Sequence, residues 1–112
     1  MKTLLWLDDI RNPKISDWLM MYAPDFVNNS ENVIWVKSYN EFIDWILKND
    51  TPYKISFDHD LGEVKSGFDC AKWLVDYCLD NQKSIPHFVV HSANPVGAEN
   101  ITHLLLNASK YI

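Results

Sequence analysis

The chain has 112 residues, 47% of them hydrophobic and 22% charged, which is the composition of one ordinary globular domain. Its formal net charge of −5 argues against a general electrostatic attraction to duplex DNA. No apolar run is long enough to span a membrane, and none has the form of a signal peptide. We therefore expect residues 1–112 to form a single cytoplasmic domain without a membrane partner.

The first third of the chain alternates apolar runs with turn-rich segments. Residues 3–7 (TLLWL) form a continuous apolar run that stops at two aspartates, as a strand buried on both faces does. Residues 15–22 have the pattern of a short helix, and residues 24–32 are polar and rich in turn formers, which predicts a loop. Residues 33–36 (VIWV) predict a second strand.

The middle of the chain contains two predicted helices and a strand. Ser38 and Glu41 stand at the spacing of a capping box and begin a helix that runs to Asn49. Residues 53–57 (YKISF) predict a third strand. Apolar residues then recur at helical spacing over residues 68–79, which predicts the next helix.

The last third adds one more strand and one more helix. Residues 88–90 (FVV) form the centre of a fourth strand, and Asn94 followed by Pro95 is typical of a helix start. The order of elements is therefore βαβαβαβα, which predicts an α/β fold with a short parallel sheet between helical layers. Right-handed crossovers favour the strand order 2-1-3-4.

Charged side chains follow the strands on either side of the point where this strand order reverses. Asp8 and Asp9 end the first strand, and Asp58, His59 and Asp60 end the third. Open parallel sheets bind ligands in the crevice at this point, beyond the carboxyl ends of the strands. We therefore expect these side chains to meet at one functional site.

A divalent cation is the simplest compensation for so many clustered carboxylates. Like charges at short range raise one another's pKa unless something balances them. Asp8, Asp9 and Asp58 are the predicted ligands of Mg²⁺ or Mn²⁺, because these ions accept a few carboxylates and keep positions for water and phosphate oxygens. The alternative is that the first two aspartates only cap a turn and the others are solvated.

Two histidines belong to the same end of the predicted sheet. His59 follows the third strand and His91 follows the fourth, so the two imidazoles could serve as general base and general acid. Asp60 would orient one of the rings. The alternatives are that one histidine binds the metal, or that each is structural and bonds to a loop carbonyl.

Three further residues could contact a phosphate group at this edge. Arg11 could donate in a fork to phosphate oxygens, or it could pair with Asp9 or Asp60. Ser92 and Asn94 follow the fourth strand and could bind a phosphate oxygen, although helix capping explains Asn94 equally well.

Four separated motifs carry a family resemblance. They are LLWLDDIRNP (4–13), SFDHDLG (56–62), SGFD (66–69) and HSANPVG (91–97), and they span most of the chain. Together they resemble the cyclic-phosphate processing receiver-like family of small phage and bacterial proteins. The resemblance implies a three-layer receiver or flavodoxin-like fold, a bacterial or phage-infected cytoplasm, and an activity on cyclic phosphate ends, as in RNA repair or nucleotide-based defence.

The chain also resembles the wider two-component receivers. Asp8 and Asp9 match the acidic pair that binds metal in receivers. Asp58 matches the phosphoacceptor, and Ser92 matches the hydroxyl residue after the fourth strand. Receivers carry a lysine after a fifth strand, and this sequence shows no fifth strand. The missing lysine and the added histidines argue against phosphorelay signalling.

The leading hypothesis is therefore a metal-assisted phosphoesterase, a hydrolase that acts on a cyclic phosphate of an RNA end or a small nucleotide. One alternative is a stand-alone phosphoacceptor receiver. Another is a non-catalytic phage module that binds a cyclic nucleotide or a host factor. The enzyme and the binding module need the same phosphate-binding residues, so the sequence leaves both open.

Overall fold

A four-stranded parallel sheet forms the centre of the fold. The computed structural model describes residues 2–14 and 18–112. The strands are β1 (Leu4–Leu7), β2 (Val33–Val36), β3 (Lys54–Phe57) and β4 (His87–Val90). All pairs are parallel and the order is β2-β1-β3-β4, which confirms the predicted α/β class and strand order.

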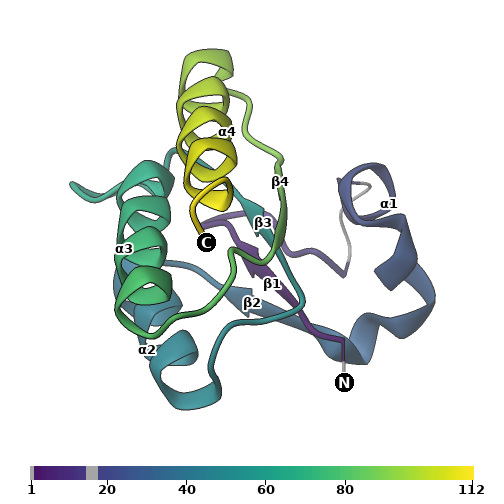
Figure 1. Cartoon of the computed structure of the whole chain (residues 1–112). Coiled ribbons are helices and arrows are strands. Elements are labelled where there is room, and N and C mark those ends of the chain that lie inside the picture. The colour runs from purple at the N-terminus through teal and green to yellow at the C-terminus, as the bar shows by residue number, and fades with distance from the viewer. Residues whose placement is uncertain (1, 15–17) are drawn as a thin grey trace.

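Helices cover both faces of this sheet and complete a three-layer arrangement. One face packs against α2 (Tyr39–Asn49), α3 (Gly67–Asp80) and α4 (Pro95–Ser109). The other face is covered by the short helix α1 (Trp18–Tyr22) and the 3-10 helix η1 (Pro24–Asn32). Figure 1 shows these two groups of helices on opposite sides of the strands.

Polar side chains fix where α2 and α3 begin. Ser66 and Asp69 form a complete capping box at α3, in which each side chain bonds to the other residue's backbone N–H. At α2 the box is only half formed, because Ser38 accepts from the Glu41 amide while the Glu41 carboxylate accepts from Lys37. These caps satisfy amides that have no partner inside the helix.

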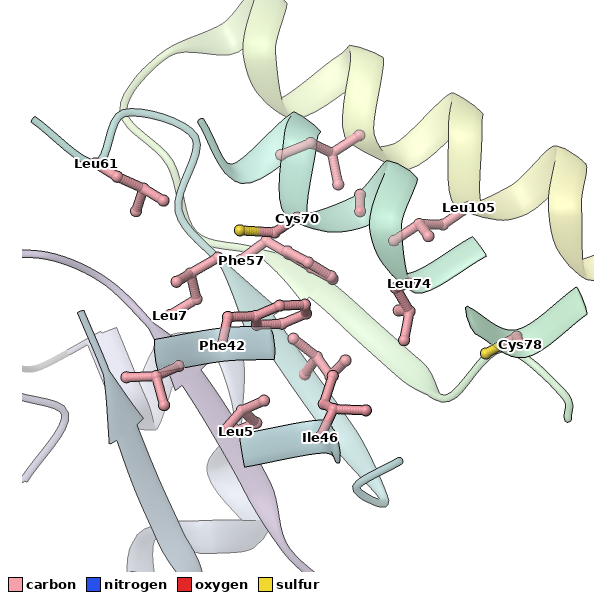
Figure 2. Packing of buried hydrophobic residues seen from close by; sticks show 14 residues of the cluster. Leu5, Leu7, Phe42, Ile46, Phe57, Leu61, Cys70, Leu74, Cys78 and Leu105 are labelled. Atoms are coloured by element: carbon pink, nitrogen blue, oxygen red, sulfur yellow. The ribbon is translucent and has the colours of Figure 1, made fainter. Parts of the chain in front are cut away.

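The larger hydrophobic core lies between the sheet and the three long helices. Leu5 and Ile55 point into it from neighbouring strands, and Phe42, Leu74 and Leu105 meet them from α2, α3 and α4. Figure 2 shows Leu5, Phe42, Leu74 and Leu105, together with Phe57, between the strands and the helices. Alternate residues of each strand therefore face this core, as the period of two requires.

The smaller core lies on the opposite face of the sheet. Leu4 and Trp6 of β1 are fully buried there against Leu19, Ala23 and Phe26 from α1, η1 and their connection. The short run of β1 is therefore apolar at every position because both of its faces are covered.

The structure differs from the sequence prediction at residues 24–32. They form a 3-10 helix instead of a loop, and the buried side chain of Phe26 anchors it in the smaller core. The predicted helix over residues 15–22 is present from Trp18 to Tyr22, and its first three residues lie outside the described part of the chain. Among the described residues, no helix is both long and apolar enough to cross a membrane.

Candidate active site at the carboxyl edge of the sheet

Three polar residues occupy equivalent positions, each directly after the last residue of β1, β3 or β4. The amides of Asp8, Asp58 and His91 donate to Val36, Leu7 and Phe57 respectively, so the hydrogen-bond ladder of the sheet continues through them. Adjacent strands of a sheet lie about 4.8 Å apart. The ladder therefore holds the three residues in one row across β1, β3 and β4.

All three side chains of this row point to the α1 side of the sheet. The register pairs Trp6 of β1 with Ser56 of β3, and the row lies two residues further along each strand. Residues two apart in a strand share a face. The two aspartates and His91 are buried, with at most 4% of each residue exposed, so they form a buried polar cluster on this face of the sheet.

Asp8 is held by several hydrogen-bond donors. Its Oδ1 accepts from the amides of Ile10 and Arg11 at 2.9 and 2.8 Å. Its Oδ2 accepts from His91 Nε2 at 3.1 Å and lies 3.5 Å from Arg11 Nη1. Burial alone raises the pKa of Asp8, but the hydrogen bonds from His91 and the two amides outweigh it and hold this pKa below its ordinary value.

Asp58 is the carboxyl group of the site that lacks such compensation. Burial, followed by the negative charge of Asp8, raises the pKa of Asp58 to about 6 from its ordinary 3.8. One oxygen accepts from the His59 amide at 2.9 Å, and Arg11 contributes an attractive charge, but these do not offset the burial. Asp58 therefore gains most from a proton or a cation at this site.

The donor set fits a hard divalent cation. Asp8, Asp9 and Asp58 each offer a carboxylate oxygen, and these oxygens lie within 4.8 Å of one another. Oxygen ligands from carboxylates are what Mg²⁺ and Mn²⁺ prefer. Burial, and after it the charge of Asp8, raises the pKa of Asp58, so a positive ion at the same place would stabilise its ionised form. The three aspartates chosen from the sequence could thus hold such an ion.

His59 lies on a different side of the site from His91. Its Nδ1 is 2.9 Å from Asp60 Oδ1, and Asn94 Nδ2 lies 3.4 Å from Asp60 Oδ2. The ring packs against the first turn of α4 at Gly97, where an added Cβ would lie only 2.3 Å from the ring. The glycine therefore makes room for the imidazole, and Asp60 and Asn94 orient it.

His91 is fully buried beneath the carboxylates. Its ring stacks on Trp6 with 4.0 Å between ring centroids, and its two nitrogens contact Ser56 and Asp8. Burial lowers the pKa of His91 despite the neighbouring negative charge of Asp8. The strand ends correctly place both histidines at this edge of the sheet, but alternation along the strand sends them into different environments.

The carboxylates open into a cavity of about 330 Å³. It is lined by Asp9, Ile10, Arg11, Asp58, Asp60, Gly62 and Ala93. The loop before α3 closes tightly beside it, because an added Cβ at Gly67 would lie 1.8 Å from the Asp58 carbonyl oxygen. Trp6, Ser56 and Gly67 also belong to the site, although the ends of the strands do not point to them, since a buried strand residue or a turn glycine has no chemical signal of its own.

Of the three predicted phosphate-binding residues, Arg11 lines the cavity, whereas Ser92 and Asn94 make hydrogen bonds near the start of α4. Arg11 lines the cavity and reaches toward Asp8. Ser92 Oγ accepts from the Asn94 amide at 3.0 Å, and the Asn94 side-chain oxygen accepts from the Gly97 amide as the cap of α4. The capping explanation of Asn94 is confirmed, and its remaining amide group faces Asp60.

The raised pKa of Asp58 predicts a pH-dependent gain from Asp58→Asn. The folded chain holds this proton more tightly than the unfolded chain, so ionisation between about pH 4 and pH 6 destabilises the fold. At about 1.4 kcal/mol for each pH unit, the loss is roughly 2–3 kcal/mol above about pH 7. Urea unfolding should show Asp58→Asn to be more stable than the wild type by this amount above about pH 7, and similar in stability near pH 4.

The matched control for this experiment is Asp76→Asn. Asp76 is exposed on α3, outside the carboxylate cluster, so its substitution should leave the pH dependence unchanged. A wild-type free energy of unfolding that does not change over this pH range would contradict the raised pKa of Asp58.

Comparisons with known proteins agree with the fold and identify the family. A solved fusion protein that carries the trimeric coiled coil of yeast Spc42 aligns with a TM-score of 0.58 and 20% identity, over 92% of this chain and 61% of that one. The chain thus spans about three-fifths of that structure, and the likeness concerns the fold alone. No curated protein matches the sequence. The family model described as the cyclic-phosphate processing receiver domain matches residues 3–107, and the chain belongs to this family.

Proposed function

We propose that the chain hydrolyses a cyclic phosphate on an RNA end or a small nucleotide with the help of a divalent cation. The observation that carries the proposal is the cluster of Asp8, Asp9 and Asp58 beside a cavity that also presents Arg11. Membership of a family named for cyclic-phosphate processing supports the substrate class. A cavity near 330 Å³ suits a terminal nucleotide or a small ligand.

Asp8, Asp9 and Asp58 are the ligands in this proposal, with Mg²⁺ or Mn²⁺ as the ion. When bound, such an ion polarises phosphoryl oxygens and neutralises the charge that develops on them. The chain contributes a pre-formed set of oxygen donors on two adjacent strands, so little rearrangement is needed for binding. Ionised Asp58 is stabilised by the same positive charge.

Arg11 is the side chain best placed to orient the phosphate. Its side chain is about one-third exposed, and its guanidinium lies 3.5 Å from Asp8 at the edge of the cavity. A planar guanidinium can donate two hydrogen bonds to two phosphate oxygens. In this proposal the Ser92 hydroxyl and the Asn94 amide group are secondary contacts, since Ser92 Oγ already accepts from the Asn94 backbone amide and Asn94 Nδ2 already donates to Asp60.

His59 is the proton-transfer residue of the proposal. An ionised Asp60 can only accept a hydrogen bond, so His59 Nδ1 carries the proton and Nε2 of the neutral ring keeps a lone pair. Nε2 takes the proton of the attacking water as the new phosphorus–oxygen bond forms. The bond from phosphorus to one sugar oxygen then breaks, and that oxygen receives the proton, which leaves a phosphate monoester.

His91 receives no proton-transfer step in this scheme. The sequence predicts a second acid or base at this position, but the His91 ring is fully buried and stacked on Trp6. A substrate in the cavity would meet the carboxylates before it met this ring. In this proposal His59 therefore transfers the proton, and His91 only holds Asp8 through a hydrogen bond.

Phosphorus NMR of an RNA oligomer that ends in a 2′,3′-cyclic phosphate tests the reaction. In the presence of Mg²⁺ or Mn²⁺, the wild type should convert the cyclic signal into a monoester signal. His59→Gln should lower the rate by about 10²–10⁴-fold, the range that a positioned acid or base contributes. Asp58→Ala should abolish conversion, because it removes a carboxylate of the cation site.

The controls separate an enzyme from a binding module. His103→Gln replaces an exposed histidine on α4 and should leave the rate unchanged. Absence of conversion with either metal, together with binding of the oligomer by the wild type, would rule out the enzyme and favour a non-catalytic phosphate-binding module.

Gly97 offers a second test through the position of His59. Helix propensity alone predicts that Gly97→Ala stabilises α4. The close approach of the His59 ring predicts instead that the added methyl group displaces the imidazole and lowers the turnover rate by about tenfold or more. In a double-mutant cycle, Gly97→Ala should have no further effect on the rate once His59 is replaced by alanine. Independent effects of the two substitutions would contradict this contact.

A phosphoacceptor role for Asp58 is the second candidate. It is favoured by the placement of Asp58 at the end of β3 beside the other two carboxylates. It predicts that beryllofluoride with Mg²⁺ shifts the amide resonances of residues 58–62 in nitrogen–proton spectra, and that Asp58→Asn removes the shift. Spectra that stay unchanged in the wild type would remove this candidate.

A further inference from the structure

A buried chain of side chains runs beneath the carboxylate cluster. Ser56 Oγ lies 2.6 Å from His91 Nδ1, and His91 Nε2 lies 3.1 Å from Asp8 Oδ2. All three residues are fully buried. The proposed reaction gives no step to the serine or the histidine, so the network needs a separate explanation.

The chemistry of the partners fixes the direction of these hydrogen bonds. An ionised Asp8 only accepts, so His91 Nε2 carries a hydrogen and donates it. In the neutral imidazole Nδ1 is then an acceptor, and the Ser56 hydroxyl donates to it. Ser56 therefore selects the one neutral tautomer that can donate to Asp8.

The small size of Ser56 is part of the same arrangement. His91 belongs to the end of β4, and the ring of Trp6 on which it stacks belongs to β1, with β3 between them. The imidazole must cross β3 to make this contact, and it does so where Ser56 faces the same side of the sheet. A larger residue at this position would stand in the path of the ring.

Asp8 is consequently held on three sides by fixed donors. Two backbone amides bind its Oδ1, and the His91 ring binds its Oδ2. The remaining contact, from Arg11 Nη1, is the longest at 3.5 Å and comes from a partly exposed side chain on the cavity. A ligand that arrives from the cavity can therefore replace Arg11 at Oδ2 without disturbing the other donors.

We propose that Ser56 and His91 are positioning residues that orient Asp8 and thereby set the affinity of the carboxylate cluster for a divalent cation. The inference rests on the cation site of the proposed function. Partners that orient a metal ligand from behind typically change metal affinity by about 10–100-fold when they are removed. Ser56 acts through His91, so the serine affects the affinity for the cation without contacting it.

Two measurements on Ser56→Ala test the inference. Calorimetric titration with Mn²⁺ should give a dissociation constant about tenfold larger than that of the wild type. Long-range nitrogen–proton NMR without metal should show one neutral tautomer of His91 in the wild type, with the hydrogen on Nε2, and a mixture of tautomers in the variant. The second readout is independent of any metal and would not respond to a purely structural loss.

Matched variants separate positioning from general destabilisation. Ile55→Val lies next to Ser56 on β3 but faces the other core, so it loses packing without altering the network, and it should keep the wild-type affinity and tautomer. Ser56→Cys replaces the hydroxyl with a larger and much weaker donor, and it should resemble Ser56→Ala in both measurements. This variant also serves if the alanine protein does not fold.

The outcomes distinguish the inference from the function on which it rests. A wild type that binds neither Mn²⁺ nor Mg²⁺ would overturn the cation site itself, and with it the control of affinity. A wild type that binds Mn²⁺ no more tightly than Ser56→Ala and Ser56→Cys would overturn only the role of Ser56. A wild-type His91 with its hydrogen on Nδ1 would also overturn that role.

Discussion

The parallel register of β1, β3 and β4 is the constraint on which the rest of the site depends. It aligns Asp8, Asp58 and His91 in one row and turns their side chains to the same face of the sheet. A shift of one residue in any of these strands would send that strand's side chain to the opposite face. Leu5 of β1 and Ile55 and Phe57 of β3 face the larger core, while Leu4 and Trp6 of β1 face the smaller one. The packing that stabilises the fold therefore also fixes which side chains meet at the carboxyl ends of the strands.

The electrostatics of the site depend on how many hydrogen-bond donors each carboxylate has, because Asp8 has several and Asp58 has few. Asp8 has two amides, an imidazole and a guanidinium within reach, and its charge is stabilised where it is buried. Asp58 is buried with one amide donor and two neighbouring carboxylates, and its burial, followed by the charge of Asp8, raises its pKa to about 6. The fold thereby concentrates its unbalanced negative charge on the residue at the centre of the row, where a proton, a cation or a phosphoryl group would each bring relief.

Much of this arrangement could be predicted from the sequence, because it depends on where strands end. Apolar runs that stop at charged residues predict the strands, right-handed crossovers predict their order, and the two together bring Asp8, Asp9 and Asp58 to one end of the sheet. The 3-10 helix over residues 24–32 was missed, since its polar composition is typical of a loop and a single phenylalanine anchors it. The burial of His91 was missed because it depends on a ring two strands away.

The two histidines lie at the same end of the sheet, but their surroundings differ, so they are not expected to have the same role. His91 continues the ladder of β4 and so inherits the inward direction of its strand, whereas His59 lies one residue beyond the ladder of β3 and turns toward α4. The glycines sharpen this division. Gly97 admits the imidazole of His59 against the helix, and Gly67 lets the α3 loop close onto the backbone of Asp58.

The motifs that carry the family resemblance therefore contain more supporting residues than reacting ones. In HSANPVG, the histidine bonds to Asp8, the asparagine caps α4 and the glycine makes room for His59. In SGFD, the serine and aspartate form the capping box, and the glycine allows the tight approach to Asp58. These positions constrain the shape of the site without dictating its reaction. The same shape could thus serve hydrolysis or phosphoryl transfer, and in the proposed function His59 and Asp60 are the residues that favour hydrolysis.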